Sequence, residues 1–222
     1  MIILVVGDSW ACGAYTNEKE SDSDSANFTH EPIQVLKPLL ESDGHIVTID
    51  CYSGQSDTPS LRSAQRHASK MDIIIFYKTG TDRAIGLQEV NKHNGIKNAF
   101  VEFDKYLYSE LESLPTRVFL IGGLDKVPID TNVDFIIPSL PELLLNTSLP
   151  IYCGGRDFFD DVMNWYNYGH IGIDDLEYAN ELMMDSIKLH KLFASNPTYF
   201  PDLGHPGEKS TKILYELIKD KL

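Results

Sequence analysis

The sequence predicts an α/β domain with a central parallel sheet. Four short apolar runs, each ended by turn-forming residues, alternate with segments of helical character. Strands buried on both faces have such unbroken apolar runs, and parallel neighbours are joined by crossover helices. The chain has 222 residues, of which 42% are hydrophobic, which is enough for a sizeable core. We therefore expect a single domain over residues 1–222.

The four predicted strands are the apolar runs themselves. In chain order they read "IILVV" before Gly7, "HIVTIDC" before "YSGQSD", "DIIIFY" before "KTGTDR", and "RVFLIGG" before Asp125. Residues that follow parallel strands lie at one edge of the sheet, where ligands bind in open α/β folds. The loops after these strands are therefore where chemistry is expected.

Helices are expected between and after the strands. The segments concerned are 32–40, 98–114, 172 to about 192, and 207–222. Residues 98–114 place four apolar side chains on one face, as a helix packed on a sheet requires: Phe100, Phe103, Leu107 and Leu111. Pro206 suits the first turn of the last helix, because proline has no N–H to leave unpaired there.

Two segments depart from this alternation. The acidic stretch "TNEKESDSDSANFTHE" is expected to be a solvated loop. Residues 125–169 are read as an inserted segment rich in proline and aromatic residues. Most of its rings are expected in the core, with a minority lining a substrate pocket or contacting a partner. The rings are Phe158, Phe159, Trp165, Tyr166 and Tyr168.

Composition argues against several classes of function. A net charge of -14 does not suit a nucleic-acid partner, which needs clustered Lys and Arg. The three cysteines, Cys12, Cys51 and Cys153, are too few and too scattered for a disulfide framework, so a reduced compartment is expected. Without a signal peptide or a bilayer-spanning apolar stretch, the sequence predicts a soluble, cytoplasmic protein with no membrane span. It indicates no oligomeric state.

Neither a metal nor an organic cofactor is predicted. The stretch "GDSWACG" lacks the G-x-G-x-x-G spacing of a dinucleotide site and the Lys-Ser/Thr pair of a P-loop. Six histidines lack metal-ligand spacing and are expected at the surface or at satisfied core positions. They are His30, His45, His67, His93, His170 and His190.

Residues with catalytic chemistry follow three predicted strands and precede the last helix. In chain order they are Ser9, Gly54, the run Thr81, Asp82 and Arg83, and the pair Asp202 and His205. Each of them alone is an ordinary turn or surface residue. Together they supply a nucleophile, a base, a group to orient the base, and candidates for an oxyanion hole.

The blocks "VVGDSW" and "DLGHP", with the glycine of "YSGQSD", resemble those of the SGNH, or GDSL, hydrolase family of esterases and lipases. The resemblance covers most of the chain and implies a flavodoxin-like three-layer α/β/α sandwich. It implies a triad of Ser9 as nucleophile, His205 as base and Asp202 as its orienting acid. The implied oxyanion donors are the backbone N–H groups of Ser9 and Gly54. The implied substrate is a short-chain acyl or acetyl ester of a carbohydrate or lipid, hydrolysed without a cofactor.

One block departs from the family pattern. The third block usually reads Gly-x-Asn-Asp, and its asparagine donates to the oxyanion, whereas "GTDR" places Asp82 there. Losing one such donor typically costs about 100- to 1000-fold in rate. A protonated Asp82, the hydroxyl of Thr81 and an inward-turned Arg83 are the open substitutes. The alternative is a weakened hydrolase fold that serves as a binding or structural module in a larger assembly.

Overall fold

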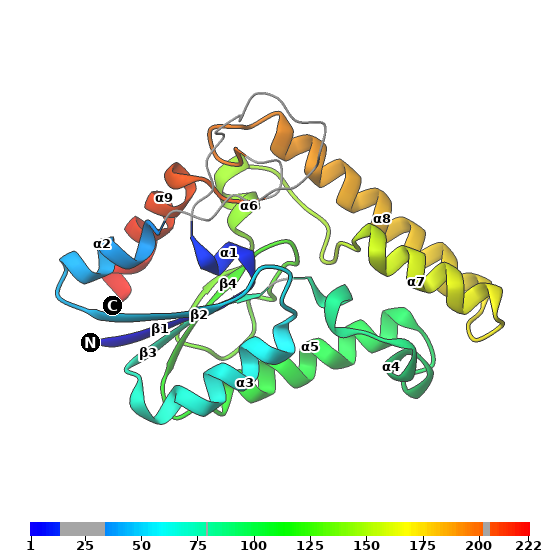
Figure 1. Ribbon diagram of the computed structural model, residues 1–222, viewed down its shortest axis with the longest axis horizontal. Coiled ribbons are helices and arrows are strands. Elements are labelled where there is room, and N and C mark those ends of the chain that lie inside the picture. The colour runs from blue at the N-terminus through cyan, green and yellow to red at the C-terminus, as the bar shows by residue number, and fades with distance from the viewer. Residues whose placement is uncertain (14–33, 79, 202–204) are drawn as a thin grey trace.

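A computed structural model describes residues 1–13, 34–78, 80–201 and 205–222. Within these residues, five parallel strands form one sheet in the order β2-β1-β3-β4-β5. The strands are β1 (Ile2–Gly7), β2 (Ile46–Cys51), β3 (Ile73–Lys78), β4 (Arg117–Gly122) and β5 (Phe135–Ile137). Helices cover both faces of the sheet (Figure 1). The prediction of an α/β fold with a central parallel sheet is confirmed, and the layers match a flavodoxin-like sandwich.

The helices divide between the two faces and an outer group. One face is covered by α1 (Ser9–Cys12), α2 (Leu36–Ser42), α6 (Leu140–Leu145), the end of α8 (Ile173–Ala194) and α9 (Glu208–Ile218). The other face is covered by α3 (Asp57–His67) and α5 (Ile96–Glu112). Helices α4 (Leu87–Lys92) and α7 (Arg156–Asn167) pack against parts of α5 and α8 in a third apolar cluster. Short 3-10 turns are η1 (Ala68–Lys70), η2 (Thr81–Ala84) and η3 (Lys219–Lys221).

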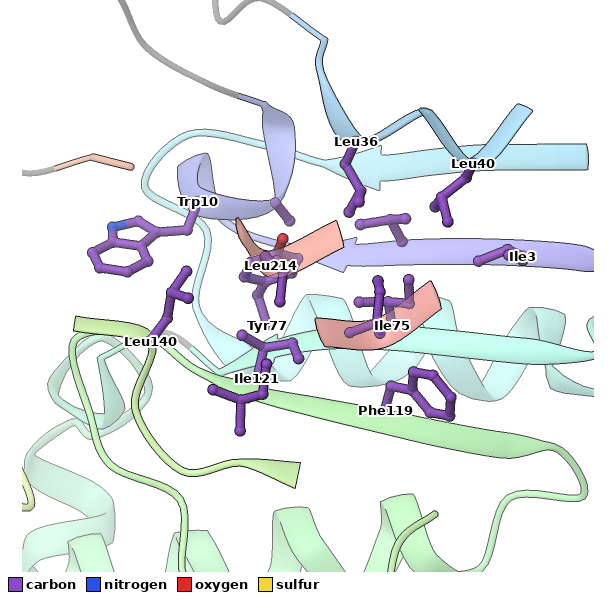
Figure 2. Packing of buried hydrophobic residues seen from close by; sticks show 14 of the residues in the cluster. Ile3, Trp10, Leu36, Leu40, Ile75, Tyr77, Phe119, Ile121, Leu140 and Leu214 are labelled. Carbon is purple, nitrogen blue, oxygen red and sulfur yellow. The ribbon is translucent and has the colours of Figure 1, made fainter. Parts of the chain in front are cut away.

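The strands are buried on both sides because their side chains alternate between two cores. Ile3 and Val5 of β1 belong to the cluster under α2 and α9, part of which Figure 2 shows. Leu4 and Val6 belong to the cluster under α3 and α5. This double burial is the reason that the strands appear in the sequence as continuous apolar runs rather than alternating ones.

Gly7 permits the sharp turn from β1 into α1. Its φ of +150° lies in the region that favours glycine, and a Cβ there would lie 2.8 Å from the Cβ of Tyr77 and 2.9 Å from that of Ala11. The chain can therefore fold back over the end of the sheet immediately after β1. That turn places Ser9, the first residue of α1, at the carboxyl edge.

The helices predicted at 98–114, 172–192 and 207–222 correspond to α5, α8 and α9. The fourth is shorter than predicted, because α2 begins at Leu36. The last helix also begins later than predicted: Gly207 is the N-cap and Glu208 the first helical residue, so Pro206 precedes the helix. The predicted acidic loop, residues 16–31, lies outside the described residues.

The segment 125–169 is more than an insertion. It contributes β5, which pairs with β4 through Phe119 and Phe135, and it contains α6 and α7. Three of its five rings within 158–168, Phe158, Phe159 and Trp165, belong to or pack against the third apolar cluster, in line with the expectation that most are core. Phe158 is buried, whereas Tyr168 is 78% exposed.

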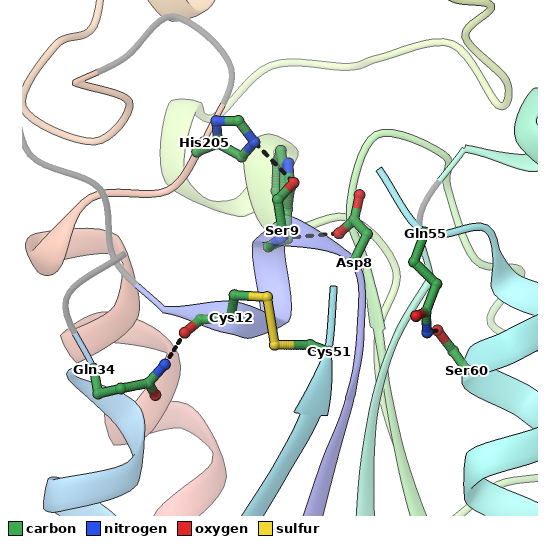
Figure 3. The surroundings of a disulfide bond; sticks show 9 residues. Asp8, Ser9, Cys12, Gln34, Cys51, Gln55, Ser60 and His205 are labelled. Carbon is green, nitrogen blue, oxygen red and sulfur yellow. Dashed lines mark hydrogen bonds between the residues drawn. A yellow bond between two sulfur atoms is a disulfide. The ribbon is translucent and has the colours of Figure 1, made fainter. Parts of the chain in front are cut away.

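The three cysteines do not build a disulfide framework, as expected, but two of them form a single disulfide that the sequence did not predict. Cys12 and Cys51 form a disulfide (Figure 3), and their Cα atoms lie 5.5 Å apart. Cys153 is free and buried. The bond joins α1, which carries Ser9, to the end of β2. The argument for a reduced compartment rested on unpaired cysteines and no longer holds. No helix among the described residues has both the length and the apolar character to cross a membrane.

Candidate active site

Ser9 and His205 meet at the carboxyl edge of the sheet. The Nε2 atom of His205 lies 2.8 Å from the Oγ atom of Ser9, although 196 positions separate them in the chain (Figure 3). Ser9 is the first residue of α1 and is 3% exposed. An imidazole nitrogen at this distance can accept the hydroxyl proton. The two residues therefore have the geometry of a nucleophile and its base.

Phe200 and Gly207, before and after His205 in the chain, are fixed by ring packing and by hydrogen bonds. Before it, Phe200 is fully buried and stacks on Phe193 with ring centroids 4.0 Å apart. After it, the N–H of Gly207 donates to the carbonyl of Tyr199 at 2.7 Å, and the hydroxyl of Ser210 donates to the same carbonyl at 2.6 Å. Phe200 also lies 6.0 Å from the Trp10 ring, next to Ser9 in sequence. The same packing therefore positions both partners of the contact.

The remaining predicted member of the triad, Asp202, lies outside the described residues. Gly54 lies in the exposed loop after β2 with a φ of +74°. That loop begins at Cys51, which the disulfide ties to Cys12 of the nucleophile's helix. The disulfide thus links the segment that carries Ser9 to the segment that carries the predicted backbone donor.

Thr81 belongs to a buried network of charged side chains. It is fully buried, and its hydroxyl lies 2.7 Å from the Nζ of Lys78, which donates to it, and 3.2 Å from Oδ1 of Asp104, which accepts from it. Its backbone N–H donates to Oδ2 of Asp125 at 2.6 Å. The hydrogen-bond partners of this hydroxyl are thus Lys78 and Asp104, which argues against Thr81 as the substitute for the family's asparagine.

Asp82 is a hydrogen-bond acceptor for another segment. Its Oδ2 accepts the N–H of Gly155, at the start of α7, at 2.8 Å. Burial, with repulsion from Asp125, raises the pKa of Asp82 to about 6. A pKa of about 6 favours the anion at neutral pH, which argues against Asp82 as a protonated donor there.

Asp8 and Arg83 form an ion pair beside the nucleophile. The Nη1 of Arg83 donates to Oδ2 of Asp8 at 2.7 Å, and Oδ1 of Asp8 accepts the N–H of Trp10 at 2.9 Å. Asp8 is 1% exposed, and burial raises its pKa, while the nearby Arg83 opposes that change. We did not single out Asp8 from the sequence, although an aspartate directly before a helix is a typical N-cap.

A buried network of charged side chains lies beneath the loops that follow β3 and β4. The Nζ of Lys78 lies 3.2 Å from Asp125 and 3.3 Å from Asp104. Burial alone would lower the pKa of Lys78, but these two carboxylates raise it well above its usual value. Asp125 also accepts the backbone N–H groups of Thr81 and Cys153 and so joins three segments at the carboxyl edge. The one sequence signal was a lysine at the end of an otherwise apolar strand.

A cavity of about 870 Å³ opens next to the Asp8–Arg83 pair. Asp82 and Arg83 form one wall, and α7 and α8 supply most of the rest, including Phe158, Phe159 and Ile187. It is large enough for a small organic ligand. No cluster of His, Cys, Asp or Glu that could hold a metal occurs in the described parts of the chain.

No protein-family model matches this sequence, and no curated protein matches it either. The contact between Ser9 and His205 is therefore the most informative feature of the site.

Proposed function

We propose that this protein is a serine hydrolase that cleaves a carboxylic ester, of the kind found in the SGNH family. The observation that carries the proposal is the 2.8 Å contact between His205 Nε2 and Ser9 Oγ. Ser9 is also positioned as such a nucleophile requires, at the sharp turn after a central parallel strand. We propose a short-chain acyl or acetyl ester of a carbohydrate or lipid as the substrate.

The chemistry follows from this pair. His205 takes the proton of Ser9 as the hydroxyl oxygen attacks the acyl carbon, and the carbonyl electrons become an oxyanion. When the intermediate collapses, the bond to the alcohol breaks and His205 returns the proton to the leaving oxygen. Water then repeats the sequence on the acyl-enzyme and releases the acid. Asp202 is the proposed orienting acid for His205.

Hydrolysis of p-nitrophenyl acetate tests the proposal. Wild-type protein should turn over this ester and react covalently with a fluorophosphonate at Ser9. Ser9→Ala should abolish both reactions, and His205→Ala should reduce them strongly. Ser113→Ala is the matched control, because the hydroxyl of Ser113 is exposed and donates only to its own helix, at Glu110. Wild-type turnover that persists in Ser9→Ala would overturn the assignment.

A non-catalytic binding or structural module is the second candidate. The observation that favours it is Asp82, an acceptor at the position where the family has an amide donor. A module would bind a glycan or protein partner stoichiometrically and would leave the fluorophosphonate unreacted. Labelling of Ser9 in the wild-type protein would exclude this candidate.

A cytoplasmic location stays a prediction. The Cys12–Cys51 disulfide weighs against it, because disulfides persist mainly in oxidising compartments.

A further inference from the structure

We propose that Arg83 supplies the side-chain donor of the oxyanion hole, held in place by Asp8. This inference rests on the proposed esterase function and names a catalytic residue for it. It replaces the neutral amide of the family pattern with a cation that follows the same strand, one position later. Three observations on neighbouring residues lead to it.

The first observation is that the two residues before Arg83 are committed elsewhere. Thr81 is fully buried in the network of Lys78 and Asp104. Asp82 accepts the N–H of Gly155 and so fixes the start of α7. In this arrangement the hydroxyl of Thr81 donates to Asp104 and the Oδ2 of Asp82 accepts from Gly155, which leaves Arg83 as the cationic donor of this run.

The second observation is the position of Arg83. Its Nη1 donates to Oδ2 of Asp8, which directly precedes the nucleophile Ser9 in sequence. The other oxygen of Asp8 accepts the N–H of Trp10, on the far side of Ser9. One buried carboxylate therefore spans the nucleophile's turn and holds the guanidinium next to it. A guanidinium carries five N–H donors, and the Nη1 contact with Asp8 engages only one nitrogen of the fork.

The third observation is that the Arg83 side chain is partly exposed. The side chain of Arg83 is 33% exposed, and it lines the cavity of about 870 Å³, whereas Asp8 is closed off from solvent. The guanidinium thus lies between a buried anion and this cavity, although neither Ser9 nor His205 is among the described residues that line the cavity. A donor held by a buried anion is preorganised, so little reorganisation is needed when the charge on the carbonyl oxygen develops.

With Arg83 as the oxyanion donor, acylation of Ser9 needs no reactant besides the ester. The Ser9 oxygen bonds to the acyl carbon, its proton passes to Nε2 of His205, and the carbonyl electron pair moves onto oxygen. Arg83 stays protonated throughout and donates hydrogen bonds to that oxygen. When the bond to the alcohol breaks, the electron pair returns to form the carbonyl and His205 protonates the leaving oxygen.

Steady-state hydrolysis of p-nitrophenyl acetate by Arg83 variants tests this role. Arg83→Met should lower kcat by about 100- to 1000-fold, with KM changed by less than about threefold. Arg83→Lys keeps the charge but loses the fork, so we expect a loss on the order of tenfold. Arg62→Met, on the exposed side of α3, is the matched control and should keep wild-type activity.

Inhibition by phenylboronic acid separates a catalytic role from a structural one. The boronate forms a tetrahedral adduct on serine and places a hydroxyl in the oxyanion position, so its inhibition constant should rise in Arg83→Met along with the loss in kcat. Circular dichroism checks folding of each variant. If Arg83→Met does not fold, the same two measurements on Arg83→Lys decide the question.

The outcomes distinguish this inference from the proposed function. A folded Arg83 variant with wild-type kcat, or with lowered kcat but unchanged boronate inhibition, would overturn the role of Arg83 and leave the esterase standing. Wild-type protein without turnover and without fluorophosphonate labelling of Ser9 would overturn both. Loss of kcat together with weaker boronate inhibition, in a protein whose turnover requires Ser9, is the result expected.

Discussion

Replacing Asp82 with asparagine should stabilise the protein, with a gain that develops over the pH range in which Asp82 ionises and is complete above that range. Asp82 is a nearly buried carboxyl group whose Oδ2 accepts the N–H of Gly155 at 2.8 Å. The amide oxygen of asparagine can accept the same hydrogen bond without carrying a charge. The substitution therefore removes a buried anion while keeping its shape and its contact.

The magnitude follows from the ionisation of Asp82. Burial, then repulsion from Asp125, raises its pKa from 3.8 to about 6 on folding. Between these values the folded protein binds more protons than the unfolded chain does, so this group lowers stability as pH rises from about 4 to about 6. A change of roughly two pKa units corresponds to about 3 kcal/mol. Asp82→Asn should therefore gain up to about 3 kcal/mol above pH 6, relative to its effect below pH 4.

Urea unfolding of both proteins between pH 4 and pH 8 measures this difference, with the fluorescence of Trp10 and Trp165 as the probe. The free-energy difference between variant and wild type should grow through pH 4 to 6 and then level off. Asp130→Asn, at an exposed position, is the control and should give a small difference that does not change with pH. A pH-independent difference for Asp82→Asn would refute the reasoning. Because Asp82 faces Gly155, we also expect its effect on ester hydrolysis to be small.

Three further predictions concern the framework of the site. Lys78→Met should destabilise the protein by about 3–5 kcal/mol in urea, because it leaves two buried carboxylates without their cation; a loss below about 1 kcal/mol would contradict this. Phe200→Ala should cost about 3–5 kcal/mol and slow ester hydrolysis, since the buried ring packs against Phe193 and against Trp10, the residue after Ser9; unaltered stability would argue against that packing. Cys12→Ser with Cys51→Ser should cost about 4 kcal/mol, from a crosslink spanning 39 positions, and thiol titration of the denatured wild-type protein should find one free thiol, not three.

Four strands and three of the helices could be predicted because their signals are local. A strand buried on both faces has an unbroken apolar run, and a helix packed on a sheet has a periodic apolar face. Both patterns are complete within about ten to twenty residues, so no knowledge of the fold is needed to recognise them. The fifth strand was missed because β5 has only three residues, too few for any pattern to emerge.

The contacts between distant segments could not be predicted in the same way. The disulfide depends on α1 lying beside the end of β2, which brings two Cα atoms to 5.5 Å. The burial of Lys78 with Asp104 and Asp125 depends on three segments meeting under one edge of the sheet. Neither the disulfide nor the buried Lys78 network produces a recognisable residue spacing in the sequence, because the partners belong to different elements.

The features of the candidate site likewise divide into those that the sequence determines and those that only the tertiary structure decides. The sequence by itself determined that Ser9 follows the first strand and that His205 precedes the last helix, because turn residues and element ends are local features. Only the tertiary structure decided that their side chains lie 2.8 Å apart, that Thr81 and Asp82 face other partners, and that Arg83 pairs with Asp8. The reason is physical: a side chain's direction depends on the packing of the element that carries it, and in this protein that packing is set by residues up to 196 positions away.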